Sequence, residues 1–239
     1  MQRYFVKKLE DNFILQDNDF HHIKNVMRIK NHGHIICVFE NKSYLCEITY
    51  DANNYQIKII EEQTADVELE KKIILYQALI RNEKFDLVVQ KACELGVSEI
   101  YPTIFERSVV KIDNDKKDNK LLRYNKIIKE ACEQSHRQTL PTFNSYINVL
   151  DITLDENTLG LIAYENENEH CSFHNALNNL NDYDKVAIVI GPEGGFSKKE
   201  VECLLKKGFK SISLGKRILR SETASLYALS VLAYKIEEM

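Results

Sequence analysis

The sequence predicts an α/β protein in which a small N-terminal β-barrel precedes a mostly parallel sheet. Residues 1–68 contain short, closely spaced runs rich in β-branched and aromatic residues, which are typical of the strands of a small barrel. From residue 73 onward, near-continuous apolar runs alternate with helical patterns, as expected for strands buried on both faces. We therefore expect two domains, 1–68 and 73–239, joined by a charged connection.

The N-terminal domain is expected to begin with a strand, a short helix at Asp17–Arg28 and a meander. Clusters of Asn, Asp and Gly between the meander strands favour turns. The expected meander strands are Ile35–Glu40, Ser43–Thr49 and Gln56–Glu61.

The C-terminal domain is expected to alternate strands with helices, which predicts parallel pairing. Ser197 and Glu200 have the spacing of a capping box, Gly96 has the position of a helix-ending glycine, and Ser221 is expected to cap the last helix. The expected strands are 73–79, 99–104, 159–164, 186–190 and 211–214, and the expected helices are 85–95, 121–134, one beginning at 197, and 221–236.

Composition limits the classes of function. The net charge is −4, so any contact with nucleic acid must come from local patches. The six cysteines form no CxxC pair, which disfavours a zinc or redox site and suits a reducing cytosol. The charged start of the chain is unlike a signal peptide, and no apolar stretch is long enough to span a membrane. We expect a cytoplasmic protein without a membrane association.

A glycine-rich loop follows the strand expected at 186–190. The motif IGPEGGF (Ile190–Phe196) holds three of the eight glycines of the chain. A loop at the carboxyl end of a sheet strand is where open α/β folds bind ligands, although a plain tight turn would use the same residues. The spacing matches neither a dinucleotide-binding fingerprint nor a Walker loop, so the ligand is expected to be something other than a phosphate.

A second loop, LGKRILRSETA (Leu214–Ala224), again joins a strand to a helix. It combines three cations with aliphatic residues and a helix N-terminus, so it could sandwich an adenine and stabilise an anion. A solvated basic loop is the alternative.

Together, IGPEGGF and LGKRILRSETA resemble the signature of the SPOUT superfamily of methyltransferases. More closely, the chain resembles the RsmE family, which methylates N3 of a uridine in bacterial small-subunit ribosomal RNA. Two differences, Ser221 where Thr is usual and Tyr124 where Trp is common, conserve the chemistry. Further motifs agree in the expected order, namely HIKNVMR (His22–Arg28), the stretch Gln77–Pro102, Glu106–Ser108, EACEQS (Glu130–Ser135), Arg137 and Pro141.

The resemblance implies a C-terminal SPOUT domain with a trefoil knot and an N-terminal PUA-like, RNA-binding barrel. It implies S-adenosyl-L-methionine as cofactor, 16S ribosomal RNA, within the small ribosomal subunit, as partner, and a homodimer. The last helix offers the apolar residues Leu226, Leu229, Leu232 and Ala233 for a dimer contact, and core packing explains the same residues equally well. The residues expected to bind the cofactor are Gly191, Pro192, Gly195, Leu214, Gly215, Ile218, Leu219, Thr223 and Ala224.

The expected chemistry assigns roles to three charged residues. N3 of uracil is protonated at neutral pH, so a guanidinium beside O2 or O4 would stabilise the anion as the methyl group arrives. Arg220 and Arg217 are the candidates, Arg220 first because it adjoins a helix N-terminus. Glu222 is a candidate base, but an ordinary carboxylate is a weak base for this step, so we favour a role in orienting an arginine. Complementing the helix dipole is the alternative for Glu222.

RNA contacts are expected from two segments with a modest excess of cations. Each segment could equally be an ordinary solvated face. His136 is expected to be a surface residue at a helix end, and no metal is expected because His170 and His174 have no apparent third ligand. The RNA-binding candidates are Arg3, His22, Arg28, Arg123 and Arg137.

Two alternatives remain open. The chain could be a SPOUT methyltransferase that acts on a ribose 2′-hydroxyl or on transfer RNA, or a non-catalytic RNA-binding or ribosome-assembly protein. The N-terminal barrel and the EACEQS segment disfavour the first, and the intact glycines and arginines of both loops disfavour the second.

Overall fold

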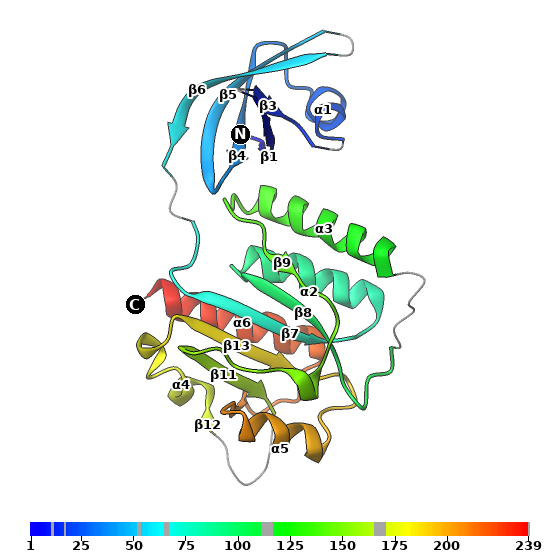
Figure 1. The fold of residues 1–239 in the computed structure, drawn as a ribbon, viewed down its shortest axis with the longest axis vertical. Helices are drawn as coiled ribbons and strands as arrows, with labels where there is room; N and C mark the ends of the chain where they lie inside the picture. Colours follow the sequence, from blue (N-terminus) through cyan, green and yellow to red (C-terminus); the bar gives the residue numbers. More distant parts are fainter. Residues whose placement is uncertain are drawn as a thin grey trace. The chain divides into compact units, whose positions relative to one another are not determined.

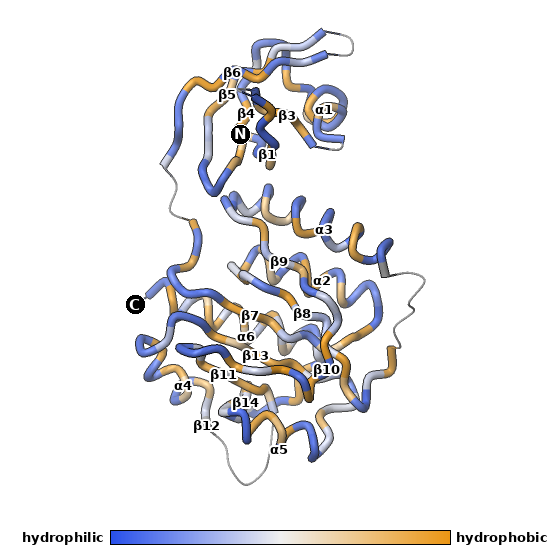
Figure 2. Tube along the Cα trace, viewed as in Figure 1, coloured by the Kyte–Doolittle hydropathy of each residue, from blue (hydrophilic) through white to orange (hydrophobic). Residues whose placement is uncertain are grey.

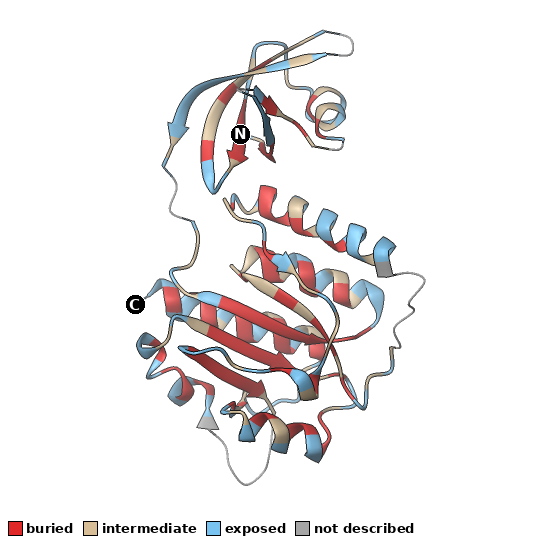
Figure 3. Ribbon diagram, viewed as in Figure 1, coloured by how far each residue is buried: buried red, intermediate tan, exposed pale blue. Residues whose placement is uncertain are grey.

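The computed structural model describes residues 1–10, 12–16, 18–51, 54–64, 67–110, 117–164 and 171–238. The chain forms two compact units, each with its own buried residues (Figure 3). The N-terminal unit comprises Met1–Glu68 and Lys129–Leu140, and the C-terminal unit comprises Leu69–Ile128 and Pro141–Met239.

The N-terminal unit is built on a four-stranded sheet with the order β1-β4-β5-β6 and an antiparallel hairpin of β2 and β3 (Figure 1). β4, β5 and β6 are antiparallel neighbours, whereas β1 is parallel to β4. The strand β3 lies beside β6, so the two layers enclose a core that includes Tyr4, Ile35 and Ile48. The strands are β1 (Arg3–Phe5), β2 (Lys7–Leu9), β3 (Asn12–Ile14), β4 (Gly33–Phe39), β5 (Lys42–Tyr50) and β6 (Tyr55–Gln63).

The helix expected at 17–28 is shorter in the structure. α1 (Asp19–His21) runs directly into a π-helical turn, η1 (His22–Val26), and Asp17 lies outside the described residues. Ile23 is fully buried, whereas Val26 and Met27 are exposed. Ile23 and the partly buried Phe20 anchor the segment in the core, and the exposed Val26 and Met27 do not extend this apolar stripe, which explains why the sequence pattern overestimated this helix.

Residues 129–140 pack with the N-terminal unit, although the sequence analysis placed them in the C-terminal domain. The Arg3 guanidinium donates hydrogen bonds to the His136 carbonyl at 2.8 Å and to the Ser43 hydroxyl at 3.0 Å. Arg137, only 4% exposed, forms an ion pair with Glu68 at 2.7 Å. Polar side chains therefore join segments far apart in the sequence, and hydrophobic periodicity does not report such contacts.

The C-terminal unit contains a parallel sheet with the strand order β10-β8-β7-β13-β11-β14-β12, and β9 pairs with β8. The fold class expected for this part, a parallel α/β sheet, is confirmed. The strands are β7 (Lys72–Ala78), β8 (Glu99–Ile104), β9 (Thr142–Phe143), β10 (Ile147–Asn148), β11 (Thr158–Ala163), β12 (Cys171–Ser172), β13 (Lys185–Ile190) and β14 (Lys210–Ser213).

Helices cover both faces of this sheet, and its central strands are strongly hydrophobic (Figure 2). The alternate residues Ile74, Ala187 and Val189 share a core cluster with Val201 and Leu204 of α5. The opposite face packs against α6, which also contacts α2. The helical segments are α2 (Asn82–Glu94), α3 (Lys117–Gln134), η3 (Val149–Asp151), α4 (Phe173–Ala176), η4 (Leu180–Asp182), α5 (Lys198–Lys206) and α6 (Ser221–Glu237).

Two of the three helix-boundary predictions hold. The capping box of Ser197 and Glu200 is formed, and Gly96 has a φ of +83° just after α2. The expected Ser221 cap is wrong, because Arg220 is the N-cap residue of α6 and Ser221 is its first helical residue. The Ser221 hydroxyl bonds to another loop instead. Within the described part of the chain, no helix is long and apolar enough to cross a bilayer.

Candidate functional site

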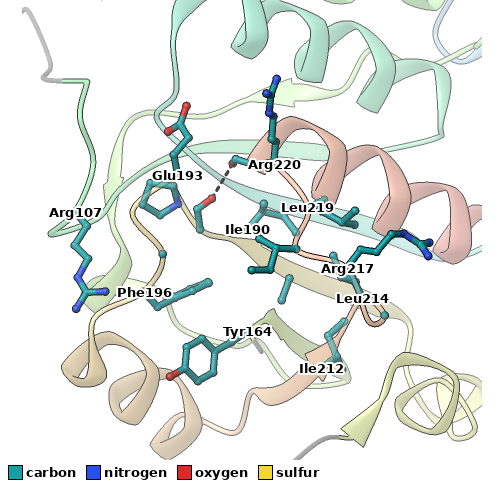
Figure 4. Close-up of a pocket in the computed structure, with 18 residues that line it drawn as sticks. Arg107, Tyr164, Ile190, Glu193, Phe196, Ile212, Leu214, Arg217, Leu219 and Arg220 are labelled. Carbon is teal, nitrogen blue, oxygen red and sulfur yellow. Dashed lines mark hydrogen bonds between the residues drawn. The ribbon is translucent and has the colours of Figure 1, made fainter. Parts of the chain in front are cut away.

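The two loops singled out in the sequence form the wall of one pocket of about 520 Å³. β13 and β14 lie on either side of β11 in the sheet, and all three are parallel. The loops that leave their carboxyl ends therefore meet at one edge. Figure 4 shows the pocket between the 190–196 loop and the 214–220 loop, with Tyr164, which follows β11, at its base.

The 191–196 loop is shaped by its glycines. The amide of Gly195 donates to the Pro192 carbonyl at 2.9 Å, and Gly195 has a φ of +69°, which closes a tight turn. A side chain on Gly191 would place its Cβ 2.7 Å from the ring of Phe196, so only glycine fits against this ring. The loop consequently presents backbone to the pocket, where a ligand can approach closely.

The 214–220 loop presents glycine and aliphatic residues. Gly215 has a φ of +115°, and a Cβ there would meet no atom within 4 Å. Glycine is therefore favoured at this position by the backbone conformation and not by a lack of space. Ile218 is 92% exposed although it lines the pocket. Ile190 and Ile212 form an apolar floor opposite this loop (Figure 4). Such a site suits a flat, partly apolar ligand that would cover Ile218.

A buried hydrogen-bond network joins the two loops to the sheet. The Ser221 hydroxyl donates to the Gly191 carbonyl at 2.7 Å, the dashed line in Figure 4, and accepts from the Gln77 amide at 3.0 Å. The Ser225 hydroxyl donates to the amide oxygen of Gln77. Gln77 and Ser225 are completely buried and Ser221 is nearly so. The network fixes the start of α6 against the 191–196 loop, because unmade hydrogen bonds at these depths are costly.

Three arginines line the rim of the pocket. Arg107 follows β8, and its guanidinium donates to the Gly194 carbonyl at 3.3 Å. Arg217 and Arg220 belong to the second loop, and Figure 4 shows their guanidinium groups directed away from the apolar floor. The site is therefore apolar within, and its charged lining residues are three arginines and Glu193, an excess of positive charge that accepts a partly apolar ligand beside an anionic polymer.

Glu222 does not line the pocket. Its carboxylate forms an ion pair with Lys84 at 2.8 Å, and its second oxygen is buried without a hydrogen-bond partner. Burial, the largest single influence, would raise the pKa of Glu222, but the hydrogen bond and charge of Lys84, the backbone hydrogen bond at the helix start and the charge of Arg220 together outweigh it, so the pKa lies below its usual value. A carboxylate held in its ionised form by a lysine is a weak base. The ion-pair partner of Glu222 is Lys84, while the charge of Arg220 also acts on its carboxylate, so an influence of Glu222 on Arg220 stays a prediction.

Eight of the nine cofactor candidates line the pocket, and Thr223 does not. Thr223 lies in a shallow groove along the outer face of α6, because one helical residue turns the side chain by about 100° from Ala224. The sequence analysis missed Arg107, Tyr164 and Phe196 as lining residues. Phe196 is the last residue of the first loop motif and Arg107 belongs to the motif at 106–108, so the sequence could have identified both as lining residues. Tyr164 reaches the pocket because β11 lies between β13 and β14, which no local motif indicates.

The five RNA-binding candidates have different surroundings. Arg28 is exposed, and Arg123 is exposed but forms an ion pair with Asp86. Arg137 is buried against Glu68, so its expected RNA contact is wrong: a guanidinium that is paired and excluded from solvent cannot reach RNA. Arg3 and His22 line a separate cavity of the N-terminal unit.

His170 lies outside the described residues. Among the residues that the structure describes, no group of three or more His, Cys, Asp or Glu side chains could hold a metal ion.

Comparison with known proteins identifies the family to which this chain belongs. The RNA methyltransferase domain family matches residues 67–233, and the RNA methyltransferase PUA domain family matches residues 15–60. The ribosomal RNA small subunit methyltransferase E of Mesomycoplasma hyopneumoniae is 37% identical over 234 residues, which cover 96% of this chain and 98% of that protein. The chain belongs to the RsmE family of RNA methyltransferases.

Other members of the RsmE family are similar to this chain over nearly its whole length. The ribosomal RNA small subunit methyltransferase E of Bacillus subtilis is 36% identical and covers 99% of this chain and 98% of its own length. The crystal structure of the Neisseria gonorrhoeae protein of the same name, bound to S-adenosyl methionine, is 30% identical with a TM-score of 0.84 and covers 97% of this chain and 96% of that one. The resemblance found in the sequence is thereby confirmed, with its SPOUT-type and PUA-like parts.

Proposed function

We propose that this protein transfers the methyl group of S-adenosyl-L-methionine to N3 of a uridine in 16S ribosomal RNA. The observation that carries the proposal is the pocket built by IGPEGGF and LGKRILRSETA at the carboxyl edge of the sheet. The names of the similar proteins and the methionine-based cofactor bound to the Neisseria relative support it. Cytoplasmic action on the small ribosomal subunit fits this role.

The residues of the pocket fit this cofactor. Its volume of about 520 Å³ lies within the usual range for small-molecule sites. Gly191 and Gly215 leave the backbone open to an adenine and its ribose, while Leu214, Ile218 and Leu219 supply apolar contact. The bound cofactor would supply an electrophilic methyl group on a sulfonium.

The protein's own residues must then handle the charge of the uracil. N3 forms a bond to the methyl group as the carbon–sulfur bond breaks, and the N3 proton passes to solvent or to a base. Negative charge spreads onto O2 and O4 when that proton leaves. Arg220, at the first turn of α6 and on the rim of the pocket, is placed to stabilise it together with the helix N-terminus. Arg217 is the second candidate on the same rim.

The target base has to leave its stack, because N3 lies on the Watson–Crick edge. The PUA-like domain is proposed to bind the surrounding RNA, with Arg28 as its exposed cationic candidate.

We also propose that the protein acts as a homodimer through the outer face of α6. Leu229, Leu232 and Ala233, considered for this role in the sequence analysis, are buried in the core instead. The opposite face carries a shallow groove without a charged residue, in which Tyr227 is 44% and Tyr234 is 65% exposed. An apolar stripe of this kind is self-complementary and favours a second copy. Thr223, at the start of this groove, lies in the first turn of α6 just after Arg220, so the second copy would reach the pocket rim.

The dimer proposal is tested by the mass of the protein in solution. The wild-type chain is expected to behave as twice its 27.8 kDa mass at micromolar concentration, and Tyr227→Glu is expected to shift it to the monomer because a charge would be buried. Lys235→Glu, an exposed change on the same helix, serves as control. A wild-type monomer at these concentrations would refute the proposal.

The function is tested by nucleoside mass spectrometry of ribosomal RNA from cells that lack this protein. We expect 3-methyluridine to disappear from 16S RNA and to return with the wild-type gene. Loss of a ribose-methylated nucleoside or of a transfer RNA modification would instead support another SPOUT activity. A non-catalytic assembly protein would leave every modification in place and would show no heat of binding with millimolar S-adenosylhomocysteine.

A further inference from the structure

A second cavity, of about 250 Å³, lies within the N-terminal unit. It brings together the HIKNVMR and EACEQS motifs, which the cofactor pocket does not use. We propose that this cavity binds an unpaired nucleobase of the substrate RNA, one that carries an amino group and is distinct from the methylated uridine. The inference rests on the proposed RNA substrate. The lining includes Arg3, His22, Glu130, Glu133, Gln134 and His136.

The first observation is the backbone of His136. This residue follows the end of α3 with a φ of +65°, in the left-handed region that favours glycine. Arg3 donates to its carbonyl at 2.8 Å and so holds the conformation. This backbone conformation is sterically less favourable for histidine than for glycine. The exposed imidazole of His136 lies beside the cavity, and a role for it there would explain why histidine occupies the position.

The second observation concerns the polar side chains of Arg3 and His22, which line the cavity. Arg3 is only 7% exposed, and its Nε is buried without a hydrogen-bond partner. The Tyr4 hydroxyl is hydrogen-bonded to Nδ1 of His22 at 3.0 Å, which fixes that ring and leaves Nε2 for another partner. A ring held in place, with one nitrogen left for a partner, is a feature of a site prepared for a ligand.

The lining of the cavity carries both signs of charge, which suits a neutral base better than a phosphate. Glu130 and Glu133 share the cavity with Arg3 and with Met1, whose N-terminal ammonium acts on His136, so a phosphate would meet carboxylates as well as cations. Glu133 is held by the Phe5 amide at 3.1 Å and by Lys129 at 3.1 Å. The edge of adenine, guanine or cytosine offers both donors and acceptors to such a mixed lining, with the amino group facing a carboxylate. The flat face of the base can stack on an imidazole.

The test compares His136→Gly with the wild-type protein. Glycine adopts the left-handed backbone freely, so the melting temperature is expected to stay equal or to rise. Loss of the imidazole is expected to raise the KM for the RNA substrate by about tenfold, as for the loss of one stacked base. The kcat and the affinity for S-adenosylhomocysteine are expected to stay unchanged. Gln134→Ala is expected to raise the same KM without lowering the melting temperature.

Asn157→Gly is the matched control. Asn157 also has a positive φ, of 57°, but lies before β11 in the C-terminal unit, so its replacement should leave the KM for RNA unchanged. Unchanged KM values for His136→Gly and Gln134→Ala, with an active wild-type enzyme, would overturn the cavity inference and leave the proposed function intact. A wild-type protein that neither binds nor methylates RNA would overturn both.

A second measurement distinguishes binding of a nucleobase from binding of a phosphate. In the wild-type protein, AMP, GMP and CMP at 20 mM (about the level that reveals weak binding) are expected to shift the imidazole NMR signals of His22 and His136. Ribose 5-phosphate is expected to shift neither. Equal shifts with ribose 5-phosphate, or no shift with any nucleotide, would contradict a nucleobase site.

Discussion

Replacing Arg220 with alanine is expected to slow methyl transfer by about 100-fold or more, as for the loss of one preorganised donor to a developing anion. Arg220 is exposed on the rim of the pocket and has no capping hydrogen bond from its side chain in α6. Its removal should therefore leave the fold and the apolar floor intact. Affinity for S-adenosylhomocysteine is expected to stay within about threefold of wild type, because this ligand carries no uracil charge.

Lys216→Ala is the control for this prediction. Lys216 is an exposed cation in the same loop but does not line the pocket. If both variants lose activity equally, the loop contributes a general positive field and Arg220 has no special role. If Arg220→Ala retains turnover near wild type, the assignment of the uracil anion to Arg220 is wrong.

Replacing Gln77 with leucine is expected to weaken the affinity for S-adenosylhomocysteine by about tenfold or more and to lower the free energy of unfolding by about 2 kcal/mol. Gln77 is fully buried in β7 and bonds to both Ser221 and Ser225. Without the amide, two buried hydroxyls lose their partner, and Ser221 no longer holds the Gly191 carbonyl in a single arrangement. Calorimetric titration and chemical unfolding measure the two effects.

Three further variants separate cofactor positioning from general destabilisation. Gln90→Leu replaces an exposed glutamine on α2 and should change neither quantity. Ser221→Thr keeps the hydroxyl and should conserve the affinity, whereas Ser221→Ala should lower it. If Ser221→Ala binds the ligand as well as Ser221→Thr does, the network stabilises the fold without shaping the pocket.

The main elements of the fold could be predicted from local patterns. Uninterrupted apolar runs marked β7, β11 and β13 because these strands are buried on both faces. The short pairings of β9, β10 and β12 were missed, since two-residue strands carry no periodic signal. The helix at 17–28 was overestimated because its core contacts come from Phe20 and Ile23, whereas Val26 and Met27 are exposed.

The candidate site was predictable where chemistry is concentrated in a short motif. Glycines within five residues and cations beside aliphatic residues marked both loops of the pocket. Thr223 was assigned to the pocket because a motif does not distinguish the two faces of a helix. Arg137 was expected at the RNA because an arginine in a motif does not reveal that Glu68, 69 residues earlier in the chain, is its partner.

The sequence by itself determined the class of fold, the family resemblance and the two loops that line the candidate pocket, since these depend on residue type over a few neighbouring positions. Only the tertiary structure decided what each polar side chain contacts. Ser221 is hydrogen-bonded to Gly191 and Gln77, Glu222 forms an ion pair with Lys84, and Arg3 donates to the His136 carbonyl. The physical reason is that hydrogen bonds and ion pairs depend on distance in space, and strand order and helix packing set those distances.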